Sequence, residues 1–301
     1  MQSKFNFDSN TNIIGIIGHP IKQSLSPLMH NSSFRIANLN YIYLPFSVPA
    51  ENLKDALTGM TALGIKGFNI TIPLKEKIAQ YLHNVSEEAG VIGAVNTVVN
   101  ENGQLYGHNT DVHGIVESLI SYKHQLEGEA VTVIGAGGAA RSCIYALIRN
   151  FKVRQINIIN RTSQIAESLK EYFDAKMHFK KFKTFELIPP DIVSVLNESK
   201  LIINSSSLGM FPSPDDSATT IEESFHDQQI VFDVVYNPMI TKLLKIAKSR
   251  GATTINGLKM FVEQGAKSYE IWTGEKMPTD EIFTILQKYL KEDHDIFDIS
   301  N

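Results

Sequence analysis

Residues 131–142, which read Val-Thr-Val-Ile-Gly-Ala-Gly-Gly-Ala-Ala-Arg-Ser, decide the fold of this chain. Their four apolar or β-branched residues predict a buried strand, and the apolar residues at 143–148 predict the buried side of a helix. Gly135 permits a tight turn between them, and Gly137 lets the backbone approach a pyrophosphate closely. The helix N-terminus would point free N–H groups at the phosphates. A plain strand-to-helix connection is the alternative, but a second strand expected at 155–159 favours dinucleotide binding.

The bulk composition is that of an ordinary globular protein. The chain has 301 residues, 43% of them hydrophobic and 20% charged, which is enough for two domains with ample cores. The formal net charge of -4 gives no reason to expect nucleic acid or an anionic membrane as a partner. A single cysteine excludes an internal disulfide and a cysteine-rich zinc site, and no metal is expected. No segment reads as a signal peptide or a membrane span, so we expect a cytoplasmic protein.

Strands and helices alternate along the first 110 residues. Strands are expected at 13–18, 41–46 and 67–72, with helices from Pro27, over 50–63 and over 75–82. A hairpin of strands at 95–99 and 104–106 is expected around Asn102-Gly103. Such alternation predicts an α/β domain with a mostly parallel sheet.

A helix that starts at Asp111 leads into a second domain. Its strands are expected at 131–134, 155–159, 201–203, 230–234 and 253–255. This order predicts a doubly wound Rossmann dinucleotide-binding sheet. Two helical patterns, 258–272 and 280–290, end the chain, and we expect them to pack on the N-terminal domain. The predicted fold is α/β with two α/β domains and a cleft between them: a substrate-binding catalytic domain of residues 1–110 plus 258–301, and a dinucleotide-binding domain of residues 111–257.

Three polar clusters outside the glycine turn could carry chemistry. In the first, Ser24 and Ser26 stand at a helix N-terminus, where two hydroxyls, free N–H groups and the helix dipole suit a carboxylate. A helix cap is the alternative, and it would explain Ser26 but not Ser24. His30, one turn into this helix, is expected to be a packed residue.

The second cluster follows a strand. Alternate side chains share one face of a strand, so Asn69 and Thr71 should point the same way, and Ile70 and Ile72 the other way. Lys75 comes just past this strand, where open α/β sheets place their ligands. The alternative for Lys75 is an ordinary surface lysine.

The third cluster contains Asn96 and Asp111. Asp111 starts a helix, where the dipole favours an ionised carboxylate; it could cap the helix, pair with a cation, or do both. If the three clusters converge, the two serines would hold the acid group of a polyhydroxylated carboxylate, and the other polar side chains its hydroxyls. Lys75 could then move the proton that accompanies hydride transfer, with Asp111 positioning it.

These motifs resemble the shikimate dehydrogenase family, including its quinate/shikimate branch. Five signatures match in order: Ser-Leu-Ser-Pro at 24–27, Asn-Ile-Thr-Ile-Pro-Leu-Lys at 69–75, Gly-Ala-Val-Asn-Thr at 93–97, Gly-His-Asn-Thr-Asp at 107–111, and the glycine turn at 135–140. Blocks at 204–210, 235–238 and 257–264 match as well. The likeness therefore covers nearly the whole chain.

The resemblance implies the reversible NAD(P)-dependent reduction of 3-dehydroshikimate to shikimate, a step of aromatic amino-acid (chorismate) biosynthesis. It places the catalytic pair on Lys75 and Asp111. It implies that the substrate is bound by Ser24, Ser26, Asn69, Thr71, Asn96, Tyr236 and Gln264. It implies that the cofactor is bound by Gly135, Ala136, Gly137, Gly138, Ala139, Asn160, Arg161, Thr162, Ser206, Met210, Val234, Gly257 and Met260.

The cofactor preference depends on the end of the second strand of the dinucleotide-binding domain. NAD-selective folds usually have an acidic residue there, but none lies between positions 155 and 166. Arg161, Thr162 and the next helix N-terminus could hold a 2′-phosphate. NADP-preferring members of the family commonly carry a second arginine where this chain has Ile165, which leaves NAD open. We predict NADP over NAD.

Two other functions stay open on the sequence. Quinate has one more ring hydroxyl than shikimate, and a single pocket side chain could decide whether it is an equal substrate. A ligand sensor that kept the fold and lost the chemistry is the other possibility, although Lys75 and Asp111 are both present. The expected partner is a small-molecule substrate, with no nucleic acid or membrane, and the chain could be a monomer or a homodimer.

Overall fold

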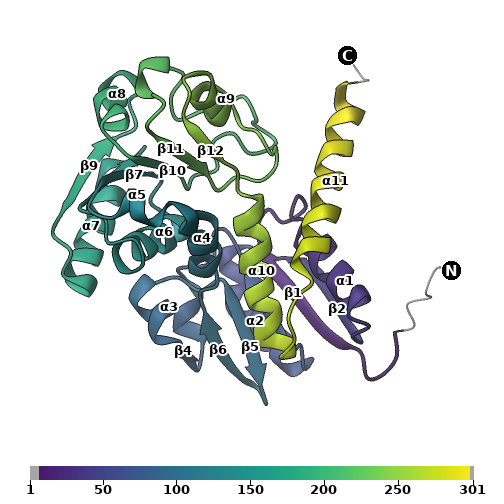
Figure 1. Cartoon of the computed structure of the whole chain (residues 1–301). Helices are drawn as coiled ribbons and strands as arrows, with labels where there is room; N and C mark the ends of the chain where they lie inside the picture. The colour runs from purple at the N-terminus through teal and green to yellow at the C-terminus, as the bar shows by residue number, and fades with distance from the viewer. Residues whose placement is uncertain (1–6, 299–301) are drawn as a thin grey trace. The chain divides into compact units, whose positions relative to one another are not determined.

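The computed structural model describes residues 7–298, and the side chains of residues 7–292. Contacts divide the chain into two compact units (Figure 1). Unit 1 extends to Thr110 and resumes over Gln264–Leu286, and unit 2 takes Asp111–Glu263 and the described residues from Gln287. The division predicted from the sequence returns to the first domain at residue 258, whereas the contacts assign residues 258–263, and those from Gln287 onward, to unit 2.

Unit 1 begins with a strand-helix-strand order, as expected. Its elements up to Thr110 are β1 (Asn12–Gly18), α1 (Ser26–Ile36), β2 (Tyr41–Ser47), η1 (Ala50–Asn52), α2 (Leu53–Ala62), β3 (Gly67–Ile70), η2 (Ile78–Tyr81), β4 (Asn84–Val85), α3 (Glu87–Ile92), β5 (Thr97–Glu101) and β6 (Gln104–His108). The helix predicted over residues 75–82 is wrong: only the 3-10 turn η2 forms there. Within η2 only Ile78 is buried, so the segment has little apolar surface to hold a longer helix against the core.

The strands of unit 1 form one sheet in the order β2-β1-β3-β5-β6-β4. β1 pairs in parallel with β2 and β3, and β4 with β6, whereas β3–β5 and β5–β6 are antiparallel. The predicted hairpin is confirmed, with φ of 54° at Asn102 and 88° at Gly103, as a tight two-residue turn requires. The hairpin is the reason that the sheet is less parallel than the sequence predicted.

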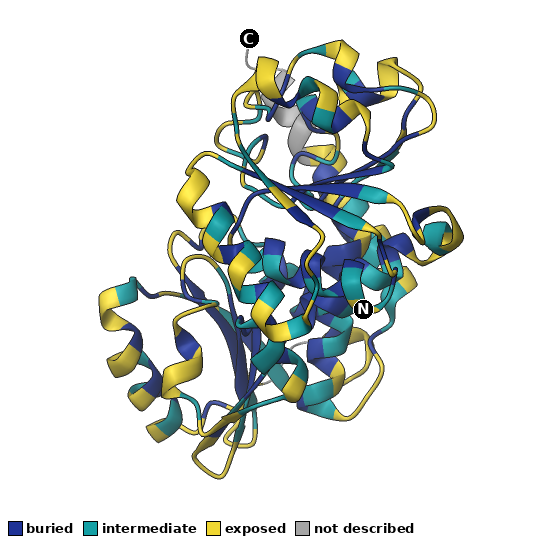
Figure 2. Cartoon of the chain, turned by 90° about the vertical axis from the view of Figure 1, so that its left-hand side faces the viewer, coloured by how far each residue is buried: buried dark blue, intermediate teal, exposed yellow. Residues whose placement is uncertain are grey.

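β3 separates an apolar face from a polar one. Phe68 and Ile70 are buried in a core with Leu57 of α2. Side chains alternate along a strand, so Asn69 faces the other way, and its amide contacts Tyr43 and Ser268 there. Figure 2 shows much of the strands in dark blue and many outward-facing helix turns in yellow. One strand thus contributes both to the core and to a buried polar cluster.

Unit 2 alternates strand and helix throughout. Its elements are α4 (Asp111–Leu119), η3 (Ile120–Tyr122), α5 (Lys123–Leu126), β7 (Ala130–Ile134), α6 (Gly138–Arg149), β8 (Gln155–Asn160), α7 (Ser163–Met177), β9 (Phe182–Glu186), α8 (Pro189–Asn197), β10 (Leu201–Asn204), η4 (Glu222–Ser224), β11 (Ile230–Asp233), α9 (Lys242–Ser249) and β12 (Thr253–Ile255). Two helices follow and have residues in both units: α10 (Leu258–Thr273) and α11 (Thr279–Asp298).

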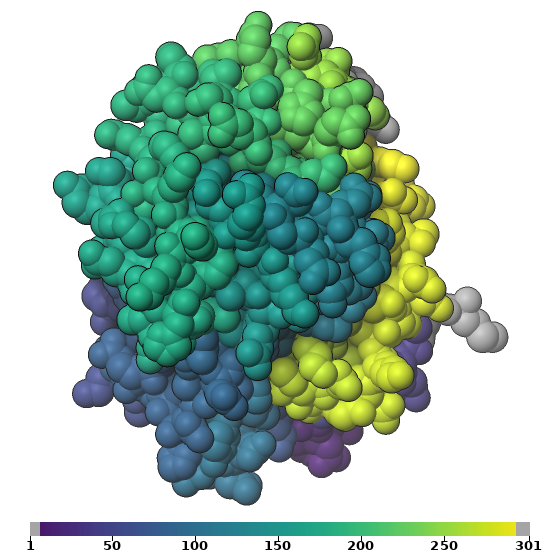
Figure 3. Space-filling model, turned by 60° about the vertical axis from the view of Figure 1, so that its left-hand side comes forward, coloured from purple at the N-terminus to yellow at the C-terminus, as the bar shows by residue number. Residues whose placement is uncertain are grey.

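The sheet of unit 2 is wholly parallel, in the order β12-β11-β10-β7-β8-β9. This is the doubly wound Rossmann order. From β7 the chain adds strands first on one side, as β8 and β9, and then on the other side, as β10, β11 and β12, so the switch point lies between β7 and β10. The edge strand β9 was not expected from the sequence. Ile134, Ile202 and Val231 form part of the core under α8 and α9. Figure 3 shows the residues of this unit, in teal and green, as a continuous surface on the face drawn.

Candidate active site

Ser24 and Ser26 stand at the start of α1. The helix begins at Ser26, its N-cap position is Leu25, and no side chain caps it, so a capping role does not account for Ser26. Instead, Ser24 Oγ accepts a hydrogen bond from the N–H of Ser26 at 3.3 Å. Ser26 is 4% exposed, and its hydroxyl has no hydrogen-bond partner within residues 7–292. A nearly buried hydroxyl in the first turn of a helix can donate to an anionic group.

Thr71 and Lys75 follow the carboxyl end of β3. Thr71 is the first residue past the strand, is half-buried, and has no side-chain partner in the part of the chain that the structure describes. Lys75 is half-buried, and its carbonyl accepts from the N–H of Val95 at 2.8 Å. This contact fixes the turn after β3 against the segment that leads into β5. The lysine is therefore held on an ordered turn and is not a freely exposed surface residue.

The amide of Asn69 is used inside unit 1. Its Oδ1 accepts from the hydroxyl of Tyr43 at 2.7 Å. Its Nδ2 lies 3.0 Å from the carbonyl of Asn96, 3.0 Å from Thr97 Oγ1 and 3.2 Å from Ser268 Oγ. An amide nitrogen carries two protons, so three acceptors within the protein leave none for a ligand. In this structure Asn69 Nδ2 therefore supports the residues around it, while Oδ1, which accepts one hydrogen bond, keeps a second lone pair.

Asn96 is the centre of the polar cluster and is 2% exposed. Its Oδ1 accepts from the N–H of Thr110 at 2.7 Å, and from the hydroxyls of Thr97 and Thr110 at 3.1 and 3.2 Å. Its Nδ2 donates to Thr110 Oγ1 at 2.9 Å and to Gln264 Oε1 at 3.4 Å. The contact with Gln264 is the longest, and a ligand hydroxyl could replace it at the least cost.

Asp111 is the first residue of α4 and is 4% exposed. The helix dipole favours a carboxylate at this position. The preceding residue, Thr110, is bonded to Asn96 through both its N–H and its hydroxyl. The main chain that carries Asp111 is therefore anchored on the same amide that faces Gln264.

His30 is a packed residue, as expected, and is fully buried. Its ring stacks on Tyr43 with 4.4 Å between centroids and meets the edge of Trp272 at 5.4 Å. Neither ring nitrogen has a hydrogen-bond partner within residues 7–292. Burial lowers the pKa of His30 to about 3, so the ring is neutral at physiological pH.

In unit 2 the glycine turn lies where the sheet order reverses, after β7 and beside the end of β10. Gly135 has φ +104°, and a Cβ there would lie 3.0 Å from Ser205 Oγ and 3.2 Å from the N of Ser206. Gly137 has nothing within 4 Å of an added Cβ, and it is the N-cap of α6. No side chain caps α6, and its first turn holds no acidic residue. This open space against a helix N-terminus fits a pyrophosphate.

The turn after β8 holds the residues expected at the adenosine ribose. Asn160 Nδ2 donates to the carbonyl of Thr162 at 3.0 Å and closes the turn. Arg161 and Thr162 are exposed, and α7 begins at Ser163 with no side-chain cap and no acidic residue in its first turn. Ile165 is 50% exposed. The turn therefore offers one guanidinium and a helix N-terminus to a 2′-phosphate.

Asp233 organises the loops after β10 and β11. It accepts from Asn204 Nδ2 at 3.0 Å, from a backbone N–H of the following loop at 3.0 Å, and from the hydroxyl of Thr241 at 2.7 Å. Burial raises the pKa of Asp233 to about 6, although these hydrogen bonds lower it. Ser206 donates to Asn204 Oδ1 at 2.6 Å, and Met210, further along this loop, is 38% exposed.

The remaining predicted ligand residues of unit 2 lie near the start of α10. A Cβ on Gly257 would lie 2.1 Å from the carbonyl oxygen of Val234, so only glycine fits there. Tyr236 is half-buried and stacks on Phe261 with 4.3 Å between centroids. Met260 is buried. These contacts bring the β11 loop and the first turns of α10 together.

Three family models match the chain in succession. They describe the shikimate dehydrogenase substrate binding domain over residues 16–98, shikimate / quinate 5-dehydrogenase over residues 117–255, and the shikimate 5′-dehydrogenase C-terminal domain over residues 257–282. A shikimate dehydrogenase (NADP(+)) of Caldanaerobacter subterraneus subsp. tengcongensis is 44% identical over 92% of this chain and 96% of its own.

The chain belongs to the shikimate dehydrogenase family.

Solved structures of this family agree with the fold. Shikimate 5-dehydrogenase of Listeria monocytogenes, in complex with shikimate and NAD, is 39% identical with a TM-score of 0.82, covering 93% of this chain and 98% of its own. The enzyme of Thermus thermophilus, in complex with NADP(H) and shikimate, is 33% identical with a TM-score of 0.80, covering 92% and 99%. The predicted family and the α/β fold with a Rossmann-type domain are confirmed.

Sequence reasoning missed three polar residues of this family member. Thr97 and Thr110 lie in the quoted motifs but were given no role, and Ser268 was not singled out. All three hydroxyls meet around Asn96. Ser268 stands one helical turn after Gln264, and this spacing is the signal that could have found it.

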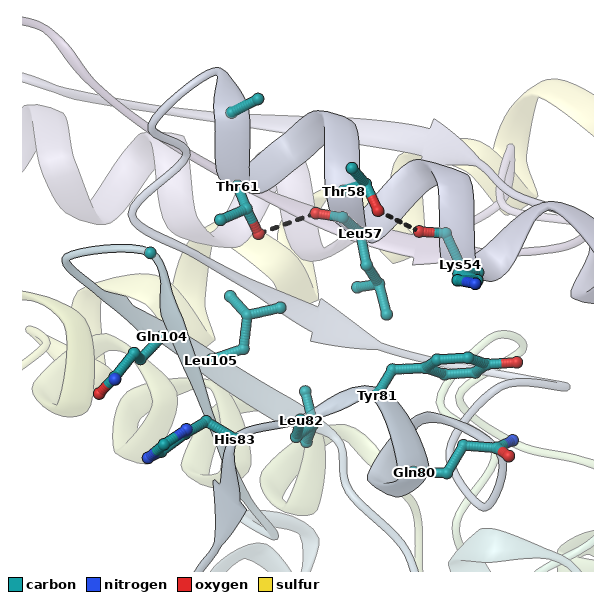
Figure 4. Close-up of a pocket in the computed structure, with 12 residues that line it drawn as sticks. Lys54, Leu57, Thr58, Thr61, Gln80, Tyr81, Leu82, His83, Gln104 and Leu105 are labelled. Carbon is teal, nitrogen blue, oxygen red and sulfur yellow. Dashed lines mark hydrogen bonds between the residues drawn. The ribbon is translucent and has the colours of Figure 1, made fainter.

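A hollow of about 610 Å³ in unit 1 holds none of the predicted site residues. It is lined by α2, η2 and the hairpin, with Leu57, Leu82 and Leu105 between them (Figure 4). The hydroxyls of Thr58 and Thr61 already donate to helix carbonyls at 3.0 and 2.8 Å. We assign no family function to this hollow.

Within the described residues, no group of three or more His, Cys, Asp or Glu side chains could hold a metal ion. Over the same part of the chain, no helix has the length and apolar character needed to cross a membrane.

Proposed function

We propose that this chain is an NADP-dependent shikimate dehydrogenase that reduces 3-dehydroshikimate reversibly to shikimate in aromatic amino-acid biosynthesis. The observation that carries the proposal is the buried cluster of unit 1 in which the amide of Asn96 bonds to Thr110 and to Gln264. It occurs in a chain 44% identical to a curated NADP-dependent shikimate dehydrogenase. Quinate as an equal substrate and a non-catalytic sensor are not favoured by these relatives.

Each polar group has a role in this proposal. Ser24 and Ser26 bind the carboxylate of the substrate, while Thr71, Asn96 and Gln264 bind ring hydroxyls. Lys75 Nζ takes the proton from the reacting hydroxyl during oxidation and returns it during reduction, and Asp111 orients the amine and that hydroxyl.

Tyr236 contributes to the substrate site from the β11 loop. The stacking of its ring on Phe261 supports a fixed orientation of its hydroxyl. Asn69 supports the site by holding Asn96 and Thr97.

NADP, when bound, supplies and accepts the hydride. The open space at Gly137 and the uncapped start of α6 support the pyrophosphate site, together with Gly135, Ala136, Gly138 and Ala139. Arg161 and Thr162, with Asn160 closing their turn, would hold the 2′-phosphate. Ser206, Met210, Val234, Gly257 and Met260 complete the proposed cofactor site.

Three further assignments belong to this proposal. The substrate-binding domain is residues 1–110 with the C-terminal helices, and the dinucleotide-binding domain is residues 111–257. The protein acts in the cytoplasm. It works as a monomer or a homodimer.

A nicotinamide absorbance assay that crosses shikimate and quinate with NADP and NAD tests the function. We expect the highest kcat/KM with shikimate and NADP. Turnover of quinate at an equal rate would contradict the substrate assignment, and a large preference for NAD would contradict the cofactor assignment. No turnover of any pair would contradict the enzyme assignment.

The role of Lys75 is tested by the substitution Lys75→Ala. Loss of the proton carrier should lower kcat by roughly 10²- to 10⁴-fold while shikimate still binds. Lys77→Ala is the matched control, because Lys77 is an exposed lysine on the same turn, and its kcat should match that of the unchanged protein. Equal losses in both variants would refute the assigned role.

A further inference from the structure

The polar cluster of unit 1 contains a closed ring of hydrogen bonds that begins and ends on one amide. Asn96 Nδ2 donates to Thr110 Oγ1 at 2.9 Å. Thr110 Oγ1 lies 3.0 Å from Ser268 Oγ, and Ser268 Oγ lies 2.7 Å from Thr97 Oγ1. Thr97 Oγ1 donates to Asn96 Oδ1 at 3.1 Å.

The orientation of the Asn96 amide is fixed by the backbone. A backbone N–H can only donate, and that of Thr110 lies 2.7 Å from one side-chain atom of Asn96, which must therefore be the oxygen Oδ1. The other atom, Nδ2, then faces Thr110 Oγ1. Each hydroxyl has one proton, and the arrangement that closes the ring runs from Thr110 to Ser268, from Ser268 to Thr97, and from Thr97 to Asn96 Oδ1, although either hydroxyl of the Thr110–Ser268 and Ser268–Thr97 pairs can be the donor.

Ser268 is the member of the ring that comes from a distant part of the chain. It lies on α10, is fully buried, and also accepts from Asn69 Nδ2 at 3.2 Å. Its proton has two acceptors, Thr97 Oγ1 at 2.7 Å and the carbonyl of Gln264 at 3.0 Å. The shorter contact, to Thr97, completes the ring. The longer contact, to the carbonyl of Gln264, joins the ring to the residue whose side chain contacts Asn96.

We propose that Ser268 is a positioning residue of the substrate site, an inference that rests on the proposed function. Through its contacts with Thr97 and Thr110 it holds the two hydroxyls that bond to the Asn96 amide, and it fixes the register of α10 against them. Asn96 Nδ2 and Gln264 Oε1 then face each other as a donor and an acceptor, 3.4 Å apart. A substrate hydroxyl can replace that long contact by accepting from Asn96 Nδ2 and donating to Gln264 Oε1.

Ser268 acts on binding and not on proton transfer, because its hydroxyl contacts the amides, and none of these hydrogen bonds involves Lys75 or Asp111. Contacts to a neutral hydroxyl away from the reacting carbon are made equally in the ground state and the transition state. Losing them raises KM and leaves kcat nearly unchanged.

The test compares Ser268→Ala with Ser268→Thr, which keeps the hydroxyl. We expect Ser268→Ala to raise the KM for shikimate about fivefold, the effect of losing one neutral hydrogen bond. The kcat and the KM for NADP should stay within about twofold, because uniform substrate binding alone is lost. Ser268→Thr should restore the KM. Equilibrium binding of shikimate, followed by the fluorescence of Trp272, the single tryptophan and one turn further along α10, should weaken by the same factor.

Ser33→Ala is the matched control. Ser33 is fully buried in unit 1, and its hydroxyl lies 2.8 Å from a helix carbonyl four residues back, a contact that Ser268 also makes at 3.0 Å, but Ser33 takes no part in the ring. Ser33→Ala should lower the melting temperature about as much as Ser268→Ala does, and it should leave the KM for shikimate unchanged. If Ser268→Ala does not fold, Ser268→Cys replaces it, because a thiol is of similar size and a weak donor.

The outcomes separate the two proposals. A protein that does not turn over shikimate at all contradicts the proposed function. A protein that turns it over, but keeps its KM in Ser268→Ala or Ser268→Cys, overturns the role of Ser268. So does a fall in kcat with no change in shikimate binding, or an equal rise of KM in Ser33→Ala.

Discussion

The two units prepare for a ligand in opposite ways. In unit 1 the polar side chains of β3 and of the segments beside β5 and β6 are tied to one another, so that Asn69 and Asn96 have their amide protons committed before any ligand arrives. In unit 2 the space beside Gly137 is open, and the uncapped backbone of α6 faces it. The first arrangement selects a pattern of hydroxyls, whereas the second accepts any diphosphate that reaches a helix N-terminus.

Sheet topology explains part of this difference. In unit 1 the antiparallel hairpin of β5 and β6 brings Asn96, just before one strand, beside Thr110, just after the other. Side chains from both sides of a hairpin can then bond to each other. In unit 2 the parallel strands all end at one edge, where main-chain turns follow β7, β8 and β10. Backbone groups therefore dominate that edge.

The largest effects are expected from two glycine substitutions in unit 2, which test whether its open space binds a diphosphate. Gly137→Ala places a methyl group in the open space, and the backbone there, with φ -92° and ψ -165°, accepts it. We expect the KM for NADP to rise roughly tenfold or more, as for an overfilled site. Stability should change by less than about 1 kcal/mol, since the lost cap preference and the gain in backbone restriction nearly cancel.

Gly135→Ala should do the reverse. At φ +104° an alanine is strained, and its Cβ would crowd Ser205 and Ser206. The free energy of unfolding should fall by about 1–3 kcal/mol. Thermal unfolding and cofactor kinetics of both variants check the pair. If Gly137→Ala bound NADP normally, the open space would not be the phosphate site.

A smaller effect is expected at the adenosine end of the same unit. Arg161→Ala should lower kcat/KM for NADP by about tenfold, the value of a charge-assisted hydrogen bond in a partly solvated site. The kcat/KM for NAD should barely change. Ile165→Arg adds a cation at an exposed position in the first turn of α7 and should shift the ratio further toward NADP. An unchanged NADP/NAD ratio in Arg161→Ala would place the 2′-phosphate elsewhere.

Elements of the fold could be predicted from the sequence where interactions between residues close together in the chain determine the structure. The apolar strand before Gly135, and the alternation of Phe68, Asn69 and Ile70, follow from steric and periodic rules that act over a few residues. The strand β9 was missed because its residues, Phe-Lys-Thr-Phe-Glu, mix charges into an edge strand. Only pairing with β8 shows that they form a strand.

The network around Asn96 could not be predicted from the sequence because its members are far apart along the chain. Ser268 is separated from Thr97 by 171 positions, and its hydroxyl reads as an ordinary helix residue until the fold brings the two together. Likewise, a ligand role for Asn69 follows from its motif, but the number of its acceptors is known only from the packed structure. Burial of polar groups is a property of tertiary contacts, and no local pattern encodes it.

The smallest expected effect is a difference in pH dependence between the two units. In unit 1, burial lowers the pKa of His30 to about 3, below the 6.5 of an unfolded histidine, so His30 costs stability as pH falls below 6.5. In unit 2, burial raises the pKa of Asp233 to about 6, above the unfolded value of 3.8, so Asp233 costs stability as pH rises from 3.8 through 6. The two groups thus act in opposite directions between about pH 4 and pH 6.

Denaturant unfolding followed by Trp272, which lies in unit 1 against His30, isolates the first of these effects. As the pH falls from 7 to 5.5, the free energy of unfolding of the unchanged protein should decrease by about 1 kcal/mol more than that of His30→Phe. The reason is that only the unfolded histidine takes up a proton in that range. For Asp233→Asn we expect the opposite dependence: its free energy of unfolding should increase relative to that of the unchanged protein as the pH rises from 4 to 6. The phenylalanine retains the aromatic stacking on Tyr43, so the comparison removes the titration and little else. Parallel pH profiles for the unchanged protein and His30→Phe would mean that His30 reaches water or a partner in solution, and that the polar side of unit 1 is less closed than its hydrogen bonds suggest.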